Sequence, residues 1–284
     1  MLLWSTGFVG AKYGLPYAQP FTFLAVRLVI ASALLWLILA ALRGEGLRGR
    51  AQWGRSALSG VLLHAGYLGG VFWAIGHGLP AGVSAVIVSL QPVVVAALAN
   101  RFLGEYLSRL QWAGLVLGVV GVVLVLAPGL VDAGRSADFP ISGIVACLVA
   151  LAAGTAGTIH QKRHGDGIPL VSGTAVQYLG AAAVLAVLSL SLESQTIDWT
   201  LEFSLAMSWL VLALSLGAVL LLLFLLKRGS ASAVSSLFYL VPPATAIEAY
   251  LLFDEELALV SILGVVVTAI GVALALRKQD AGAA

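Results

Sequence analysis

Charged residues are scarce in this chain of 284 residues. Asp, Glu, Lys and Arg make up 10% of it, whereas they make up about 25% of an average soluble domain. Hydrophobic residues supply 61%. Because a soluble protein needs charge to solvate its surface, most of this surface must face something other than water. The net charge of +2 is also too small to suggest a nucleic-acid partner.

Side chains that bind metals or form disulfides are nearly missing as well. The one cysteine, Cys147, lies in an apolar run, which excludes an intrachain disulfide and a cysteine-based metal site. The four histidines, which are His64, His77, His160 and His164, lack the spacing of a zinc motif. No basic leader precedes the first apolar segment, so we expect no cleaved signal peptide. We also expect no metal and no cofactor.

Long apolar runs take the place of the missing charge. A bilayer core about 30 Å thick requires about 20 apolar residues of helix. Nine runs reach that length and residues 1–14 form a shorter tenth, so the sequence predicts an all-α membrane protein with ten transmembrane helices. The nine runs lie near residues 20–42, 56–79, 81–101, 107–127, 139–161, 168–190, 203–226, 230–252 and 257–276.

The two halves of the chain resemble each other when one is shifted by 150 residues. Between residues 81–126 and 231–276, 13 of 46 aligned pairs are identical. An apolar composition inflates such a count, but matched proline, glutamate and glycine positions are harder to produce by bias. The pattern therefore indicates a tandem duplication. The matched pairs include Pro92 with Pro242, Glu105 with Glu255, Gly114 with Gly264 and Gly121 with Gly271.

Each repeat holds five helices, and an odd number places the second repeat in the membrane with the opposite orientation. With a cytoplasmic N-terminus, twelve Lys and Arg residues fall on the cytoplasmic side and two on the outer side. This is a strong positive-inside bias. We therefore predict two inverted five-helix repeats, over residues 1–128 and 139–276. The protein should be a multi-pass inner-membrane protein with both termini cytoplasmic and residues 191–202 outside.

Several runs of sequence resemble a known family. The runs LGEYLSRLQWAGLVLGVVGVVLVL and FDEELALVSILGVVVTAIGVALAL resemble the end of the repeat in EamA-type proteins of the drug/metabolite transporter superfamily. The stretch SASAVSSLFYLVPPATA is similar to the penultimate helix of that family, and LLWSTGFVGAKYG to its first helix. The resemblance implies ten helices, a central cavity between the repeats, and export of amino acids or related small metabolites.

We interpret the chain as a secondary transporter or facilitator that exports amino acids or related metabolites by alternating access. Its partners are then the small substrate and the lipid bilayer, and the sequence does not decide whether it forms a homodimer. An exporter of drug cations or of nucleotide sugars is the nearest alternative, although few buried acids are present to offset a cation. A membrane-embedded enzyme or a purely structural protein is the alternative from another class. No constellation of nucleophile, base or metal ligands supports catalysis.

A transporter needs polar groups at mid-depth that replace the water around its substrate. His64 and Tyr67 are three residues apart, so they share one face of a helix. Lipid is a poor environment for imidazole, and we expect this face to line a cavity, with interhelical hydrogen bonding as the alternative. The full set of expected substrate-binding residues is Trp4, Ser5, His64, Tyr67, Gln91 and Tyr239.

Three prolines lie near the middles of the fourth and ninth predicted helices: Pro92, Pro242 and Pro243. Each removes a backbone donor and weakens the helix, which produces either a static kink or a hinge. Equivalent positions in the two repeats favour hinges. Arg27 and Glu248 lie at comparable depth inside predicted helices, where they can pair, snorkel outward, or act on a substrate or proton.

The first predicted helix is short. Its 14 residues span about 21 Å at a rise of 1.5 Å per residue, less than the bilayer core. Residues 139–150 also lack a counterpart in the first repeat. We expect the natural protein to start roughly a dozen residues upstream, with a distorted inner end of this helix as the alternative.

Overall fold

The computed structural model describes residues 3–4, 6–7, 13–79, 81–104, 106–136, 140–241, 243–244, 247 and 258–276. Every regular element in these residues is a helix, and one isolated antiparallel bridge joins Ala18 to Ile197. Six helices are long and apolar enough to cross a membrane, and three shorter apolar helices accompany them. The prediction of an all-α membrane protein is therefore confirmed.

In the first half, proline and glycine lie at helix ends that suit their backbone conformations. Pro20 opens the first long helix, a position where its missing N–H costs no hydrogen bond. Gly104, at φ 68°, ends another in the left-handed conformation that suits glycine. The elements are η1 (Leu15–Tyr17), α2 (Pro20–Ala41), α3 (Gly49–Gly60), η2 (Val61–Gly69), α4 (Gly70–Gly76), α5 (Ala81–Ser89), α6 (Gln91–Leu103) and α7 (Arg109–Ser136).

Two helices of the second half begin at hydroxyl caps. The side chains of Thr200 and Ser230 accept hydrogen bonds from backbone N–H groups three residues later. Such caps satisfy amides that a helix leaves unpaired at its N-terminus. The elements are α8 (Ile141–His164), α9 (Leu170–Leu192), α10 (Leu201–Trp209), η3 (Leu210–Ala218), α11 (Val219–Arg228), α12 (Ala231–Ser236), η4 (Leu237–Leu240) and α14 (Leu259–Ala275).

Corresponding elements of the two halves are separated by a nearly constant number of residues. α2 begins at Pro20 and α9 at Leu170, 150 positions later. Each half also has a nine-residue π-helix inside its helix of 28 residues: η2 begins at Val61 and η3 at Leu210. A π-helix has one more residue per hydrogen-bonded turn and is rare outside functional sites. Apolar periodicity does not reveal it, because a π-helix has the same apolar composition as the α-helix around it.

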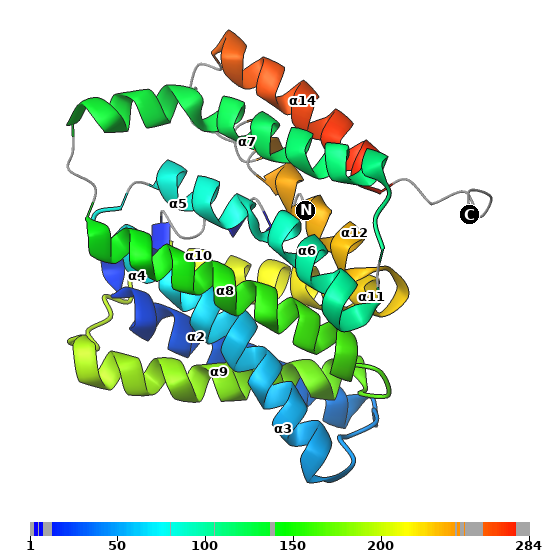
Figure 1. The fold of residues 1–284 in the computed structure, drawn as a ribbon. Coiled ribbons are helices and arrows are strands. Elements are labelled where there is room, and N and C mark those ends of the chain that lie inside the picture. The colour runs from blue at the N-terminus through cyan, green and yellow to red at the C-terminus, as the bar shows by residue number, and fades with distance from the viewer. Residues whose placement is uncertain are drawn as a thin grey trace.

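Corresponding helices also pack against each other. α2 lies along α9, and α7 lies along α14 (Figure 1). Glycines bring α7 and α14 into backbone contact: a Cβ on Gly114 would lie 2.6 Å from the carbonyl oxygen of Gly271, and one on Gly264 would lie 2.8 Å from that of Gly121. Such close approach replaces hydrophobic association, which is weak between helices in lipid.

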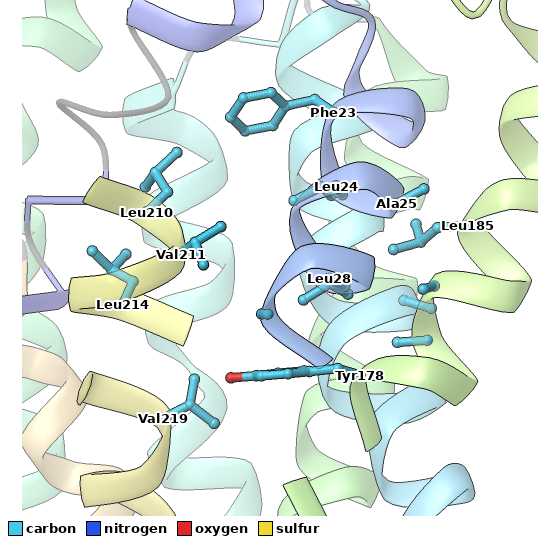
Figure 2. Packing of buried hydrophobic residues seen from close by; sticks show 14 of the residues in the cluster. Phe23, Leu24, Ala25, Leu28, Tyr178, Leu185, Leu210, Val211, Leu214 and Val219 are labelled. Carbon is cyan, nitrogen blue, oxygen red and sulfur yellow. The ribbon is translucent and has the colours of Figure 1, made fainter. Parts of the chain in front are cut away.

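The largest cluster of buried apolar side chains joins α2, α9 and η3 (Figure 2). Phe23 and Leu28 of α2 are 0% and 1% exposed, and they face Leu210 and Val211 of η3. The phenol of Tyr178 reaches across from α9. The polar side chains described in the next subsection lie next to this cluster.

One end of α2 is fixed by the other half of the chain. Both carboxylate oxygens of Glu193 accept hydrogen bonds from the first amides of α2, those of Phe21 and Thr22, at 2.7 Å. A carboxylate at this end also opposes the positive end of the helix dipole. Nearby, Tyr17 donates a hydrogen bond to Glu202, and this bond raises the pKa of the Tyr17 hydroxyl.

Two glycines of α3 allow a matched test of the packing. A Cβ on Gly60 would lie 1.9 Å from the carbonyl oxygen of Gln177 on α9, whereas one on Gly54 would meet no atom within 4 Å. Gly60→Ala should therefore destabilise the protein by about 2 kcal/mol or more. Gly54→Ala should be neutral or stabilising by up to about 1 kcal/mol, because alanine favours a helix. Thermal unfolding of the purified variants in detergent measures both, and equal midpoints would contradict the α3–α9 contact.

Candidate functional site

A pocket lies between helices of the two halves. Its empty volume, including the open space at its mouth, is about 600 Å³. The walls come from η2, α6 and the segment of Trp4 in the first half, and from α8, α11, α12 and η4 in the second. The polar side chains that line it are His64, Tyr67, Gln91, Thr158 and Ser235.

Gln91 and Thr158 form the hydrogen-bonded part of the wall, and the ring of Tyr67 lies beside them. Gln91 Nε2 donates to Thr158 Oγ1 at 3.3 Å, and Thr158 Oγ1 donates to the carbonyl of Gly154 at 2.9 Å. Gly154 makes room for this arrangement, because a Cβ there would lie 2.7 Å from the Tyr67 ring and 3.2 Å from Gln91 Oε1. The amide and the hydroxyl are thus fixed in place.

Two polar atoms of the lining, Nε2 of His64 and Oγ of Ser235, make no hydrogen bond of good geometry within the described residues, although the side chain of Gln177 lies close to His64. The side chains are 7% and 1% exposed. A buried polar atom without a partner costs about 1–3 kcal/mol. Five further buried atoms of the described residues also lack a partner, those of Ser56, Ser84, Thr155, Gln177 and Tyr239, but His64 and Ser235 alone among the seven line the pocket. A ligand with its own donors and acceptors would remove the cost at these two atoms.

The orientation of His64 is set by η2 and α9. His64 and Tyr67 lie on the π-helix and both line the pocket. The ring of Tyr178 meets the imidazole edge-on, with centroids 4.9 Å apart. Tyr178 is itself held by a hydrogen bond from its hydroxyl to the backbone carbonyl of Ser215. The imidazole is therefore supported from behind by a fixed aromatic ring.

The other end of the pocket is apolar. Trp4 and Phe238 meet edge to face, with ring centroids 5.4 Å apart. Leu222 and Leu223 of α11 complete this part of the wall. The lining is therefore mostly apolar, and His64 and Ser235 are among its few polar members.

Four of the six residues expected to bind substrate line this one pocket: Trp4, His64, Tyr67 and Gln91. Tyr239 does not line it. Its fully buried ring lies against Gly118 of α7, where a Cβ would be 2.3 Å away. Ser5 lies outside the described residues. The role of all six in binding stays a prediction.

One of the three expected hinge residues, Pro92, lies at a break between two helices. Pro92 is in the first turn of α6, directly after the turn at Leu90 that separates α6 from α5. Pro243 is buried in a helical segment beyond η4, and Pro242 lies outside the described residues. A proline in a first turn is compatible with its helix. Whether the chain bends at these prolines during a functional cycle stays a prediction.

Sequence reasoning missed Thr158, Ser235 and Phe238. Serine and threonine are common in membrane helices, where their hydroxyls usually bond to the preceding turn. Thr158 does so, but Ser235 has no such bond. No pattern in the sequence separates these two cases, because the difference depends on which helix packs alongside.

Arg27 and Glu248 were expected to lie at comparable depth. Arg27 is 5% exposed, and its Nε donates to the hydroxyl of Ser215 at 3.0 Å. Burying a charge costs several kcal/mol, and a hydrogen bond to a charged group returns about 1.5–3 kcal/mol. Glu248 lies outside the described residues, so the pair stays a prediction.

Comparison with known proteins decides what kind of protein carries this pocket. The sequence profile of the EamA-like transporter family matches residues 1–127 and again residues 141–277. The chain belongs to the EamA-like transporter family. The resemblance noted in the sequence is thereby confirmed, and the protein is a multi-pass membrane transporter.

Relatives extend over almost the whole EamA-like chain. It is 27% identical to the uncharacterized transporter YvbV of Bacillus subtilis, over 99% of the chain and 90% of that protein. It is 25% identical to the uncharacterized inner membrane transporter YedA of Escherichia coli K12, over 95% of the chain and 86% of that protein. A probable amino-acid metabolite efflux pump of Salmonella typhimurium shares 25% identity over 57% of the chain and 51% of the pump.

A solved crystal structure shares the fold of the EamA-like chain. The TM-score is 0.80 at 19% sequence identity, and the match covers 96% of this chain and 93% of the other. At this identity the likeness shows the fold alone.

Adjacent serines of the pocket region permit a test of the unpartnered hydroxyl. Ser236 donates to the carbonyl of Ala233 at 2.7 Å, whereas Ser235 Oγ has no partner among the described residues. Ser236→Ala should lower the free energy of unfolding by about 1 kcal/mol. Ser235→Ala should leave it unchanged or slightly higher, yet reduce substrate transport. Thermal unfolding and a transport assay check both, and normal transport by Ser235→Ala would remove this hydroxyl from the site.

Proposed function

We propose that this EamA-like protein is a secondary transporter or facilitator that exports amino acids or related small metabolites by alternating access. One observation carries the proposal: a pocket walled by both halves of the chain joins an apolar end to polar atoms without partners. A small molecule with an apolar side chain and a polar end complements it. A pocket between two similar halves is also the arrangement from which alternating access follows.

The proposed architecture is ten helices in two inverted five-helix repeats, over residues 1–128 and 139–276. The family profile matches the chain twice, close to these bounds. The regular spacing of α2 and α9 and the reciprocal glycine contacts of α7 and α14 support an internal two-fold relation. The described residues near the N-terminus, 3–4, 6–7 and 13–14, are helical, as a tenth helix requires.

The proposed site uses residues of both repeats. Trp4 and Phe238 take the apolar part of the substrate, while His64, Tyr67, Gln91 and Ser235 take the polar part. Bending at the prolines of the fourth and ninth helices then opens the pocket to one side or the other. The sets predicted from the sequence stay part of the proposal: Trp4, Ser5, His64, Tyr67, Gln91 and Tyr239 for binding, of which Tyr239 does not line the pocket described above, and Pro92, Pro242 and Pro243 for hinging.

Two observations favour amino acids over drug cations. One relative is named a probable amino-acid metabolite efflux pump. The described lining of the pocket also has no acidic side chain to offset the charge of a cation. An inner-membrane location is supported by the name of the relative YedA.

Uptake of radiolabelled amino acids into liposomes that contain the purified protein tests the proposal directly. Wild-type protein should accelerate uptake of at least one amino acid over empty liposomes. His64→Ala and Tyr67→Ala should reduce that uptake about tenfold or more, because each removes polar contacts from the pocket. His77→Ala is the matched control, since His77 is exposed at the end of α4 and should leave uptake unchanged. Full activity of both pocket variants would exclude His64 and Tyr67 from the site.

Labelling of single cysteines tests the proposed orientation. Gly46 and Ser194 lie beyond opposite ends of α2: Gly46 follows its C-terminus, and Ser194 bonds to Gln19 before its N-terminus. In a Cys147→Ala background, Ser194→Cys should react with an impermeant maleimide in intact cells. Gly46→Cys should react only after lysis, and no neighbouring atom hinders it. The reverse pattern would overturn the orientation.

A further inference from the structure

Arg27 places a positive charge inside the protein with little to balance it. The side chain is 5% exposed. Its Nε donates to Ser215 Oγ, which is neutral, and no carboxylate of the described residues forms an ion pair with it. A guanidinium is always protonated and can donate five hydrogen bonds. Arg27 therefore has unused capacity to bind an anion.

Arg27 is connected to the pocket wall through neighbouring side chains. Ser215 links it to the same wall, because its side chain accepts from Arg27 and its backbone carbonyl accepts from Tyr178, whose ring supports His64. The four residues come from α2, η2, α9 and η3, which pack around one another. Arg27 itself does not line the pocket.

The second half of the chain fills the corresponding place without a charge. The residue 150 positions after Arg27 is Gln177, on α9. Gln177 is 2% exposed, and its Nε2 donates to Gln161 Oε1 at 3.1 Å. The Oε1 of Gln177 has no hydrogen-bond partner among the described residues. A neutral amide thus occupies this place in the second half, so the charge of Arg27 is not needed to fill it.

We propose that Arg27 selects substrates by their carboxylate group, which it binds during passage through the protein. The inference rests on the proposed transport function. A guanidinium offers a carboxylate two parallel hydrogen bonds, a geometry that an ammonium group does not reproduce. With no acidic side chain in the described pocket lining, zwitterionic and anionic acids are favoured over amines that lack a carboxylate.

Arg27→Gln is the decisive variant, because it copies the residue that the other half carries at the same place. Uptake of radiolabelled L-leucine into liposomes should fall about ten- to a hundredfold, the loss expected for one hydrogen bond to a charged group. Arg27→Lys should retain part of the activity. Arg48→Gln, which removes an arginine whose side chain is 80% exposed, is the matched control and should transport normally.

Competition separates a role in carboxylate recognition from a structural role. In wild-type liposomes, unlabelled 4-methylpentanoate should inhibit leucine uptake more strongly than the isosteric 4-methylpentanamide. In Arg27→Gln this preference should disappear while the monodispersity and thermal midpoint stay near those of wild type. A variant that transports less but keeps the preference for the acid would overturn the proposal.

Binding to the purified protein keeps the inference testable if leucine uptake fails. Absence of uptake by wild type would count against the proposed function, whereas thermal stabilisation in detergent by 4-methylpentanoate, compared with its amide, reports on Arg27 alone. The acid should stabilise the wild-type protein more than the amide does. The two compounds should stabilise Arg27→Gln equally. Equal stabilisation of wild type by both compounds, or by neither, would overturn the inference.

A Glu248→Gln variant tests the alternative that Arg27 only pairs with Glu248. If Arg27 and Glu248 serve only to pair with each other, Glu248→Gln should abolish the preference for the acid just as Arg27→Gln does. The double variant should then show no further loss of uptake. The proposal expects instead that Glu248→Gln keeps the preference. The first result would overturn it.

Discussion

Lipid offers no hydrogen-bond partner to a polar atom, and the rest of this structure depends on that constraint. Backbone groups are paired inside helices, so the helices can approach until their backbones touch. Gly114 and Gly121 on α7 and Gly264 and Gly271 on α14 allow this contact. Packing in lipid depends on contact rather than on exclusion of water. A methyl group added at one of these glycines therefore changes the stability more than several exposed leucines do.

The same constraint gives meaning to polar side chains that have no partner. Most hydroxyls of the described helices bond to a carbonyl one turn earlier, as Thr158 does. Ser235 and His64 differ, because each leaves a buried atom unpaired at the pocket wall. Stability alone would favour their replacement by apolar residues. Their presence is explained when a ligand completes their hydrogen bonds.

Much of the helix arrangement follows from the sequence, because bilayer thickness fixes the length of an apolar run. The predicted run 20–42 corresponds to α2, and 168–190 to α9, each within two residues. The run predicted at 56–79 begins earlier, at Gly49, because the first turns of α3 are polar and hydropathy does not count them. The π-helices were missed because they change hydrogen-bond register without changing apolar composition.

The site was partly predictable for the same reason. His64, Tyr67 and Gln91 are conspicuous because polar residues are rare in apolar runs, and they meet at one pocket. Ser235, Thr158 and Phe238 are not conspicuous, and only the packing of α12 and α8 brings them there.

Duplication explains why the charge of Arg27 stands out. Two copies of one five-helix unit would meet at equivalent residues, so each buried position has an internal reference in the other copy. At Arg27 that reference is Gln177, which is buried and hydrogen-bonded without a charge. Packing therefore tolerates an amide at this place, and only an interaction with an anion distinguishes the guanidinium from it. The difference between the two copies, rather than their likeness, locates the residue that discriminates among substrates.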